Sequence, residues 1–152
     1  MKHSIFIKII TVLTAILLCT ACGGDKSTQT PPAEQQMLET TIAAAAEEAA
    51  SLEEVLQNEP LNQMEMNETA GAIYTIWDDL LNTIWGMLQE ELDDETMAQL
   101  KAEQLDWITQ KEAAVQAAGA EVEGGSMYPL VTNLKAAELT EERVYVLAEY
   151  LQ

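Results

Sequence analysis

The chain has 152 residues, and 48% of them are hydrophobic, which is enough apolar material for one domain with a packed core. Its charge is extreme, because 26 acidic residues stand against seven basic ones and give a net charge of −19. A surface this acidic repels phosphate backbones and anionic lipid headgroups, so nucleic acid is excluded as a partner and a basic protein is favoured.

Residues 1–22 have the features of a bacterial export signal. Lys2 and Lys8 lie in a short basic start, and the apolar run 9–18 that follows is too short for a permanent membrane span. The run ends in CTACGG, which resembles a lipobox because small residues precede Cys22 and glycines follow it. Cys19 departs from this pattern, since an aliphatic residue usually stands three positions before the lipidated cysteine.

We therefore expect cleavage before Cys22, acylation of its thiol with a fatty acid such as palmitate, and a lipid-anchored protein on the cell membrane. The protein would face the extracellular or periplasmic side. The alternative is an ordinary secretory signal with two incidental cysteines. Removal of the signal leaves five basic residues and 26 acidic ones, a mature charge of −21.

Two segments of different composition precede the predicted domain. Residues 23–33 (GGDKSTQTPPA) are rich in Gly, Ser, Thr and Pro and predict a flexible tether. Residues 34–59 are rich in Ala, Glu and Leu, and they predict a helical stalk that ends before Pro60. Its apolar residues recur four and three apart, as in a heptad seam: Leu38, Ile42, Ala45, Ala49, Leu52 and Leu56. The seam can pack on the chain's own domain or on a second copy, and the oligomeric state stays open.

Residues 60–152 predict an all-α domain built on a long helical hairpin between Met66 and Trp107. One apolar row recurs at steps of four and three: Ile73, Trp77, Leu80, Ile84 and Leu88. A second row lies one residue further round the helix: Tyr74, Leu81, Trp85 and Leu92. Together they form an apolar arc too wide for one partner helix to cover. We therefore expect a small antiparallel helical bundle in which Trp77 and Trp107 pack across the hairpin.

The second helix of the hairpin should begin at Asp93 and Asp94, which can cap its first amides. Its predicted buried face carries Met97, Leu100, Trp107, Ile108 and Val115, and Gly119 is a natural stop. Two short C-terminal helices should follow. One runs from Met127 to Ala137 with Ser126 as its cap and Pro129 in its first turn, and the other is capped by Thr140. No strand signal occurs in the mature sequence.

The mature sequence offers little for catalysis. The only histidine, His3, and Cys19 lie in the signal, and Cys22 would be acylated. Nucleophilic sites that need histidine, and His-based zinc sites, are therefore excluded, and no cofactor or metal is expected. Among 26 acidic residues, some carboxylate pair at a glycosidase spacing is expected by chance, so we expect a protein that is not an enzyme.

From about Met64 onward, one set of residues is informative through its order and spacing: Met66, Asn67, Ala70, Asp78, Leu81, Asn82, Trp85, Leu88, Gln104, Trp107, Lys111, Glu112, Gly124, Gly125, Ser126, Thr140 and Arg143. Through these residues the chain resembles the LprI-like lysozyme-inhibitor domain family of bacterial envelope proteins. The resemblance implies an all-α domain that inhibits a muramidase. The family typically has cysteines where this chain has Thr69, Val115 and Lys135, so the family's disulfides cannot form here.

Four polar residues of the domain are predicted to be structural: Asp78, Asn82, Gln104 and Arg143. Asn82 and Gln104 stand among apolar positions and would fix helix register through hydrogen bonds. Arg143, the only arginine, would satisfy Asp78 or Glu112 across the bundle, although a binding role is the alternative. The scattered methionines are predicted to fill the core.

Two function classes follow. The first is a surface-tethered lipoprotein that binds and inhibits lysozyme, a basic partner. The second is an envelope adaptor or scaffold without catalytic activity. The predicted partner contacts lie in an acidic turn and in a Gly-rich hinge: Glu90, Glu91, Asp93, Asp94 and Glu95 in the turn, and Glu121, Glu123 and Ser126 in the hinge.

Overall fold

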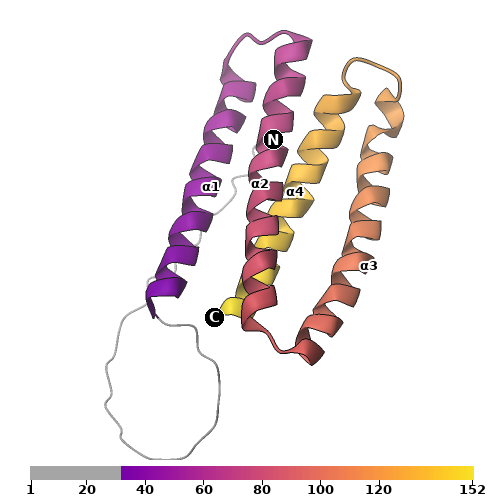
Figure 1. Cartoon of the computed structure of the whole chain (residues 1–152). Helices are drawn as coiled ribbons and strands as arrows, with labels where there is room; N and C mark the ends of the chain where they lie inside the picture. The colour runs from indigo at the N-terminus through magenta and orange to yellow at the C-terminus, as the bar shows by residue number, and fades with distance from the viewer. Residues whose placement is uncertain (1–31) are drawn as a thin grey trace, which may run out of the picture.

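The computed structural model describes residues 32–152, and these residues form an all-α bundle (Figure 1). The elements in chain order are α1 (Pro32–Asn58), α2 (Gln63–Glu91), α3 (Asp94–Gly119), η1 (Ala120–Val122), α4 (Tyr128–Ala148) and η2 (Glu149–Leu151). No strand occurs within residues 32–152, so the predicted all-α class is confirmed. The expected signal, Cys22 and most of the expected tether lie outside the described residues.

The helices lie side by side in the order α1, α2, α4, α3 (Figure 1). Consecutive helices run antiparallel, as predicted, so α2 and α4 run parallel to one another. Helix α2 packs extensively on α4 and on α1, whereas α3 packs mainly on α4. The wide apolar arc of α2 is thus covered by two helices, and α4 separates most of α2 from α3.

The core follows the predicted apolar row of α2. Ile73, Ile84 and Leu88 are at most 1% exposed, and they are joined by Val144 and Leu147 of α4, which are fully buried. Burial of this many large side chains is the main stabilising contribution to the fold.

The predicted contact between Trp77 and Trp107 is replaced by other partners. The Trp77 ring packs against Tyr145 of α4, with ring centroids 6.2 Å apart and planes tilted by 53°. Trp107 is only half-buried, and Arg143 of α4 lies over its ring. The reason is that α4 lies between most of α2 and α3, so each tryptophan packs against α4 and not against the other tryptophan.

Helix α1 docks on the chain's own domain. Leu38 and Ala49 of its heptad seam are buried against the core, and Ile42, Ala45 and Leu52 are half-buried there. The seam is therefore used within one chain, as in the first of the two predicted arrangements.

Caps explain why two of the helices begin where they do. Asn62 accepts hydrogen bonds from the amides of Met64 and Glu65, and the Glu65 carboxylate accepts one from the Asn62 amide, which completes a capping box before α2. Asp93 caps α3 in the predicted manner through the amides of Glu95 and Thr96.

Helix α3 ends at Gly119, as predicted, but not through a left-handed glycine cap. Gly119 keeps a right-handed conformation and leads into η1. A Cβ atom at this position would lie 2.6 Å from the Tyr128 ring and 2.8 Å from the Thr132 methyl group. Glycine is needed here because α3 and α4 approach closely, and not because the chain turns.

The predicted boundary at Thr140 is wrong, because α4 continues through it. The Thr140 hydroxyl is fully buried and donates to the Ala136 carbonyl at 2.7 Å, so the side chain is satisfied inside the helix. Ser126 makes no cap bond either, although Pro129 does lie in the first turn of α4 as predicted. The short η2 completes the C-terminal part.

Four of the methionines that were predicted to fill the core fall into two groups. Met87 and Met97 pack against the core, in line with the prediction. Met64 and Met127 are 64% and 46% exposed, so core filling was the wrong prediction for these two.

Candidate functional site

The acidic turn between α2 and α3 is the first predicted contact. All five of its acidic residues are exposed: Glu90, Glu91, Asp93, Asp94 and Glu95. Asp93 is committed to the fold, because its carboxylate accepts bonds from the Thr96 amide at 2.9 Å and the Thr96 hydroxyl at 2.8 Å. These bonds hold the pKa of Asp93 below its ordinary value. The other four carboxylates form no ion pair within residues 32–152, so they are available to a partner.

The Gly-rich hinge between α3 and α4 is the second predicted contact. Gly124 has φ of +73°, which glycine adopts without strain, and the Gly125 amide donates to the Val122 carbonyl at 2.9 Å. The Ser126 carbonyl accepts a bond from Asn67 Nδ2 of α2 at 2.9 Å, so the hinge is fixed to the bundle. Ser126 and both acidic residues of the hinge, Glu121 and Glu123, are exposed.

The two predicted contacts lie at opposite ends of the bundle (Figure 1). The acidic turn lies beside the start of α1 and the C-terminus, and the hinge lies beside the connection from α1 to α2. One small contact surface therefore cannot contain both groups.

Arg143 and Gln104 form the buried polar pair of the bundle. Arg143 Nε donates to Gln104 Oε1 at 2.8 Å, and the guanidinium lies over the Trp107 ring at 5.9 Å. Arg143 thus pairs with Gln104 and not with the predicted Asp78 or Glu112. Burial lowers the pKa of Arg143, and its Nη2 atom has no hydrogen-bond partner within the described structure. This pair links α3 to α4.

Tyr74, Asp78 and Lys111 link α2 to α3. Lys111 Nζ donates to the Tyr74 hydroxyl at 3.2 Å, and this hydroxyl donates to Asp78 Oδ1 at 3.1 Å. Burial first, and then the Asp78 charge, raise the pKa of Tyr74 to about 12. Asn82 donates to the Asp78 carbonyl and carboxylate within the same helix, at 2.9 and 3.2 Å. Asn82 therefore does not tie two helices together in the predicted way.

A pocket of about 310 Å³ opens between α2 and α3, and we call it the α2–α3 pocket. Its walls hold many of the residues that carry the family resemblance: Asp78, Leu81, Asn82, Trp85, Gln104, Trp107 and Lys111. Three of the four basic residues within residues 32–152 lie in or beside it: Lys101, Lys111 and Arg143. Lys111 lies over the rings of both Tyr74 and Trp107, so the wall of this pocket is already occupied by internal contacts.

A protein-family model described as "Lysozyme inhibitor LprI" matches residues 27–147. The chain belongs to this family. No curated protein and no solved structure matches the chain.

The LprI match begins well before the residues that first indicated the resemblance. It includes all of α1, whose seam packs on α2. Helix α1, which was predicted to be a separate stalk, is therefore covered by the same family match as the rest of the bundle.

In this LprI chain, none of the three positions where the resemblance implies cysteines carries a cysteine, and the contacts of Thr69 and Lys135 lie within their own helices. Thr69 donates to the Glu65 carbonyl within α2, Lys135 forms an ion pair with Glu138 at 2.9 Å, and Val115 is half-buried in α3. No disulfide joins these positions, so α3 is held by its polar links, the close contact at Gly119 and the few apolar contacts around Leu100.

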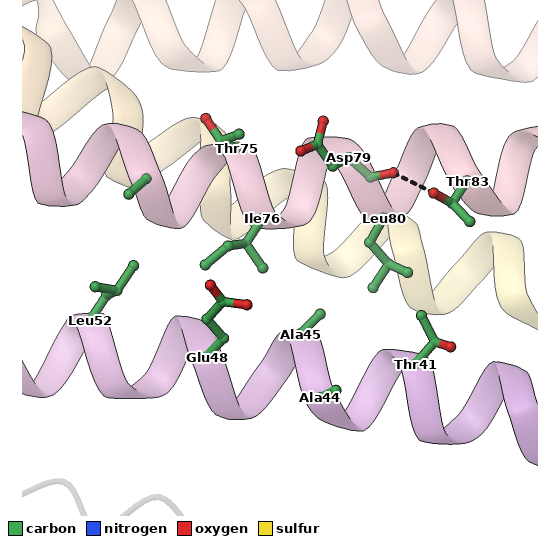
Figure 2. A pocket seen from close by; sticks show the side chains of 11 residues that line it. Thr41, Ala44, Ala45, Glu48, Leu52, Thr75, Ile76, Asp79, Leu80 and Thr83 are labelled. Atoms are coloured by element: carbon green, nitrogen blue, oxygen red, sulfur yellow. Dashed lines mark hydrogen bonds between the residues drawn. The ribbon is translucent and has the colours of Figure 1, made fainter.

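A second and larger groove runs between α1 and α2, and sequence reasoning missed it. It encloses about 730 Å³, and we call it the α1–α2 groove; its lining includes Ala44, Ala45, Glu48, Ala72, Ile76 and Asp79. Figure 2 shows Glu48 extending from α1 toward Ile76 of α2. The run of alanines in α1 was a usable signal, because small residues beside a seam leave space between two helices.

Within residues 32–152 no cluster of His, Cys, Asp and Glu has the arrangement of a metal site. None of the helices in this part of the chain combines the length and apolar character needed to cross a membrane. The features of the described surface that bear on ligand binding include its acidic ends, the α2–α3 pocket and the α1–α2 groove.

Proposed function

We propose that this protein is a lipid-anchored envelope protein that binds lysozyme and inhibits its muramidase activity. The observation that carries the proposal is the family match over residues 27–147. The net charge of −19 supports it, because lysozyme is strongly basic. The same family membership supports a role in binding and not in catalysis.

The proposed anchor is Cys22, which would hold the domain at the outer face of the membrane through acyl chains. Cells labelled with radioactive palmitate should incorporate the label into the protein, and Cys22→Ala should release it from the membrane fraction. An unlabelled protein, or a Cys22→Ala variant that stays with membranes, would refute the anchor without affecting the proposed partner.

Exposed carboxylates at both ends of the bundle would attract a basic partner before contact. Such attraction acts on the whole surface and does not by itself block an enzyme. Inhibition requires that part of the complex covers the catalytic cleft and keeps the cell-wall substrate out. We propose that either the acidic turn or the hinge makes that contact, since each is exposed and acidic.

The test is clearance of a bacterial cell-wall suspension by lysozyme across a salt series. The protein is the mature chain from residue 23, without lipid. Charges more than about 8–10 Å apart are largely screened near 0.15 M salt, so a nonspecific complex should lose its effect there. A true inhibitor keeps its close contacts and should still block clearance.

An unrelated acidic protein of similar charge is the control. If this control inhibits equally at low salt, and both lose their effect by about 0.15 M, the inhibitor function is rejected. The adaptor or scaffold function would then replace it.

A further inference from the structure

The α1–α2 groove has an apolar floor. Ile76 and Leu80 of α2 contribute apolar side chains to it, and Ala44, Ala45 and Ala72 leave room for a visiting group to reach them. A neighbouring apolar pocket of about 180 Å³ continues along the same two helices and shares Leu80 as a lining residue. The floor can therefore cover the aliphatic part of a long side chain.

The charge along this groove has one sign. Glu48 and Asp79 line the groove, and neither forms an ion pair within residues 32–152. Neither α1 nor α2 contains a lysine or an arginine, because the basic residues of the described chain all lie in α3 and α4. The carboxylates of the groove thus lack a cation on the helices that form it.

A basic side chain fits this combination. Lysine and arginine have long aliphatic stems that can lie on apolar surface while the charged end stays near solvent. A carboxylate at the edge of an apolar floor matches such a side chain at both ends. A second copy of this acidic chain is a poor occupant, because like charges repel across the contact.

We propose that the α1–α2 groove is the docking surface for a basic protein partner, and that it receives a Lys or Arg side chain flanked by apolar residues. Glu48 accepts the charged group, and the floor around Ile76 covers the stem. The inference rests on the proposed function, since lysozyme is the basic partner in question, and it adds a contact along the side of the bundle to those at its ends.

Two pairs of adjacent substitutions on α1 test the groove. Glu48→Gln removes the α1 carboxylate of the groove, whereas Glu47→Gln makes the same change in charge at a residue that does not line the groove. Ala44→Leu fills the groove, and Ala43→Leu adds the same bulk outside it. All four positions are exposed, so each variant should keep the melting temperature of the parent.

The measurement is lysozyme affinity of the mature chain at about 0.15 M salt, where long-range attraction is screened. Glu48→Gln and Ala44→Leu should each weaken affinity about tenfold, as expected for the loss of a charge-assisted hydrogen bond or of space at the contact. The two control variants should bind like the parent.

Two results would overturn the inference while the proposed function stands: equal binding by all four variants and the parent, or equal weakening by Glu48→Gln and Glu47→Gln. A change in self-association at the groove variants, with unchanged lysozyme binding, would assign the groove to a second copy and also overturn it. If the parent neither binds nor inhibits lysozyme at this salt, the proposed function fails and the inference fails with it.

Discussion

The two outer helices, α1 and α3, are held to the central pair α2 and α4 by different kinds of contact. Helix α1 attaches through an apolar seam, and no side-chain hydrogen bond within the described structure joins it to another element. Helix α3 buries few side chains, chiefly Leu100 and Gln104, and attaches through polar links and the close approach at Gly119.

The difference bears on how each helix can be recognised from sequence. An apolar seam is periodic, so the packing face of α1 can be predicted from residue spacing alone. Polar links such as Arg143 to Gln104 depend on which helix lies opposite, and periodicity carries no information about that. Helix α3 is therefore placed by single contacts, and it should respond more strongly to single substitutions at them.

The largest effect should come from the central pair that both outer helices share. Trp77 is 2% exposed, so Trp77→Ala should destabilise the domain by about 3–5 kcal/mol. Trp107 of α3 is only half-buried, so Trp107→Ala should destabilise the domain by only about 1–2 kcal/mol, through loss of its cation contacts and of its partial burial. Thermal and urea denaturation measure both. Equal losses of stability would mean that Trp107 contributes as much to the core as Trp77, and would contradict the difference drawn between α3 and the central pair.

A smaller effect is expected at the contact between α3 and α4. Gly119→Ala places a methyl group against Tyr128 and Thr132 and should destabilise by about 1–3 kcal/mol. Gly86→Ala is the matched control, because nothing lies within 4 Å of the added atom and helix propensity should stabilise by about 0.5–1 kcal/mol. Urea denaturation should therefore show opposite signs, and two stabilising variants would remove the close contact as an anchor of α3.

The smallest effect concerns the link from Tyr74 to α3. The folded pKa of Tyr74 is raised to about 12, so the fold favours the neutral phenol. Its stabilisation is fully present below about pH 10 and is lost as pH rises toward 12. The full shift overstates the effect for a partly exposed group, and we expect a loss of about 1 kcal/mol after solvent screening.

The control for this pH effect is Tyr74→Phe, which lacks the titrating group. Urea denaturation at pH 9 and pH 11 should show a larger loss for the parent than for Tyr74→Phe, with faster amide exchange in α3 than in α1. The same loss in both proteins would show that Tyr74 does not anchor α3.

Much of the fold could be predicted from the sequence because it depends on local patterns. The apolar row through Ile73 and Leu88 gave the buried face of α2, and Asp93 marked the start of α3. The order of the helices could not be predicted, because the width of the apolar arc on α2 shows that two partner helices are needed but not which two. Thr140 followed by two glutamates is typical of a helix start, yet its hydroxyl bonds to Ala136 and the helix continues.

The surfaces were harder to predict than the fold. The exposed carboxylates of the acidic turn were evident from composition, and they are exposed as expected. The α1–α2 groove was not evident, because it exists only where particular faces of two helices meet. Arg143 was expected to make a contact across the bundle and it does, but its partner Gln104 lies on α3 and could not be identified from spacing.

The proposed anchor at Cys22 would give the bundle a direction relative to the membrane, because α1 begins ten residues after it. With Cys22 acylated as proposed, residues 23–31 can span at most about 32 Å, so α1 begins close to the lipid surface. The acidic turn lies at that same end, and the hinge lies at the opposite end, so the two are separated by about the 40 Å length of α1. The hinge is therefore the end of the bundle that can reach farthest from the proposed anchor, toward a lysozyme arriving from outside the cell.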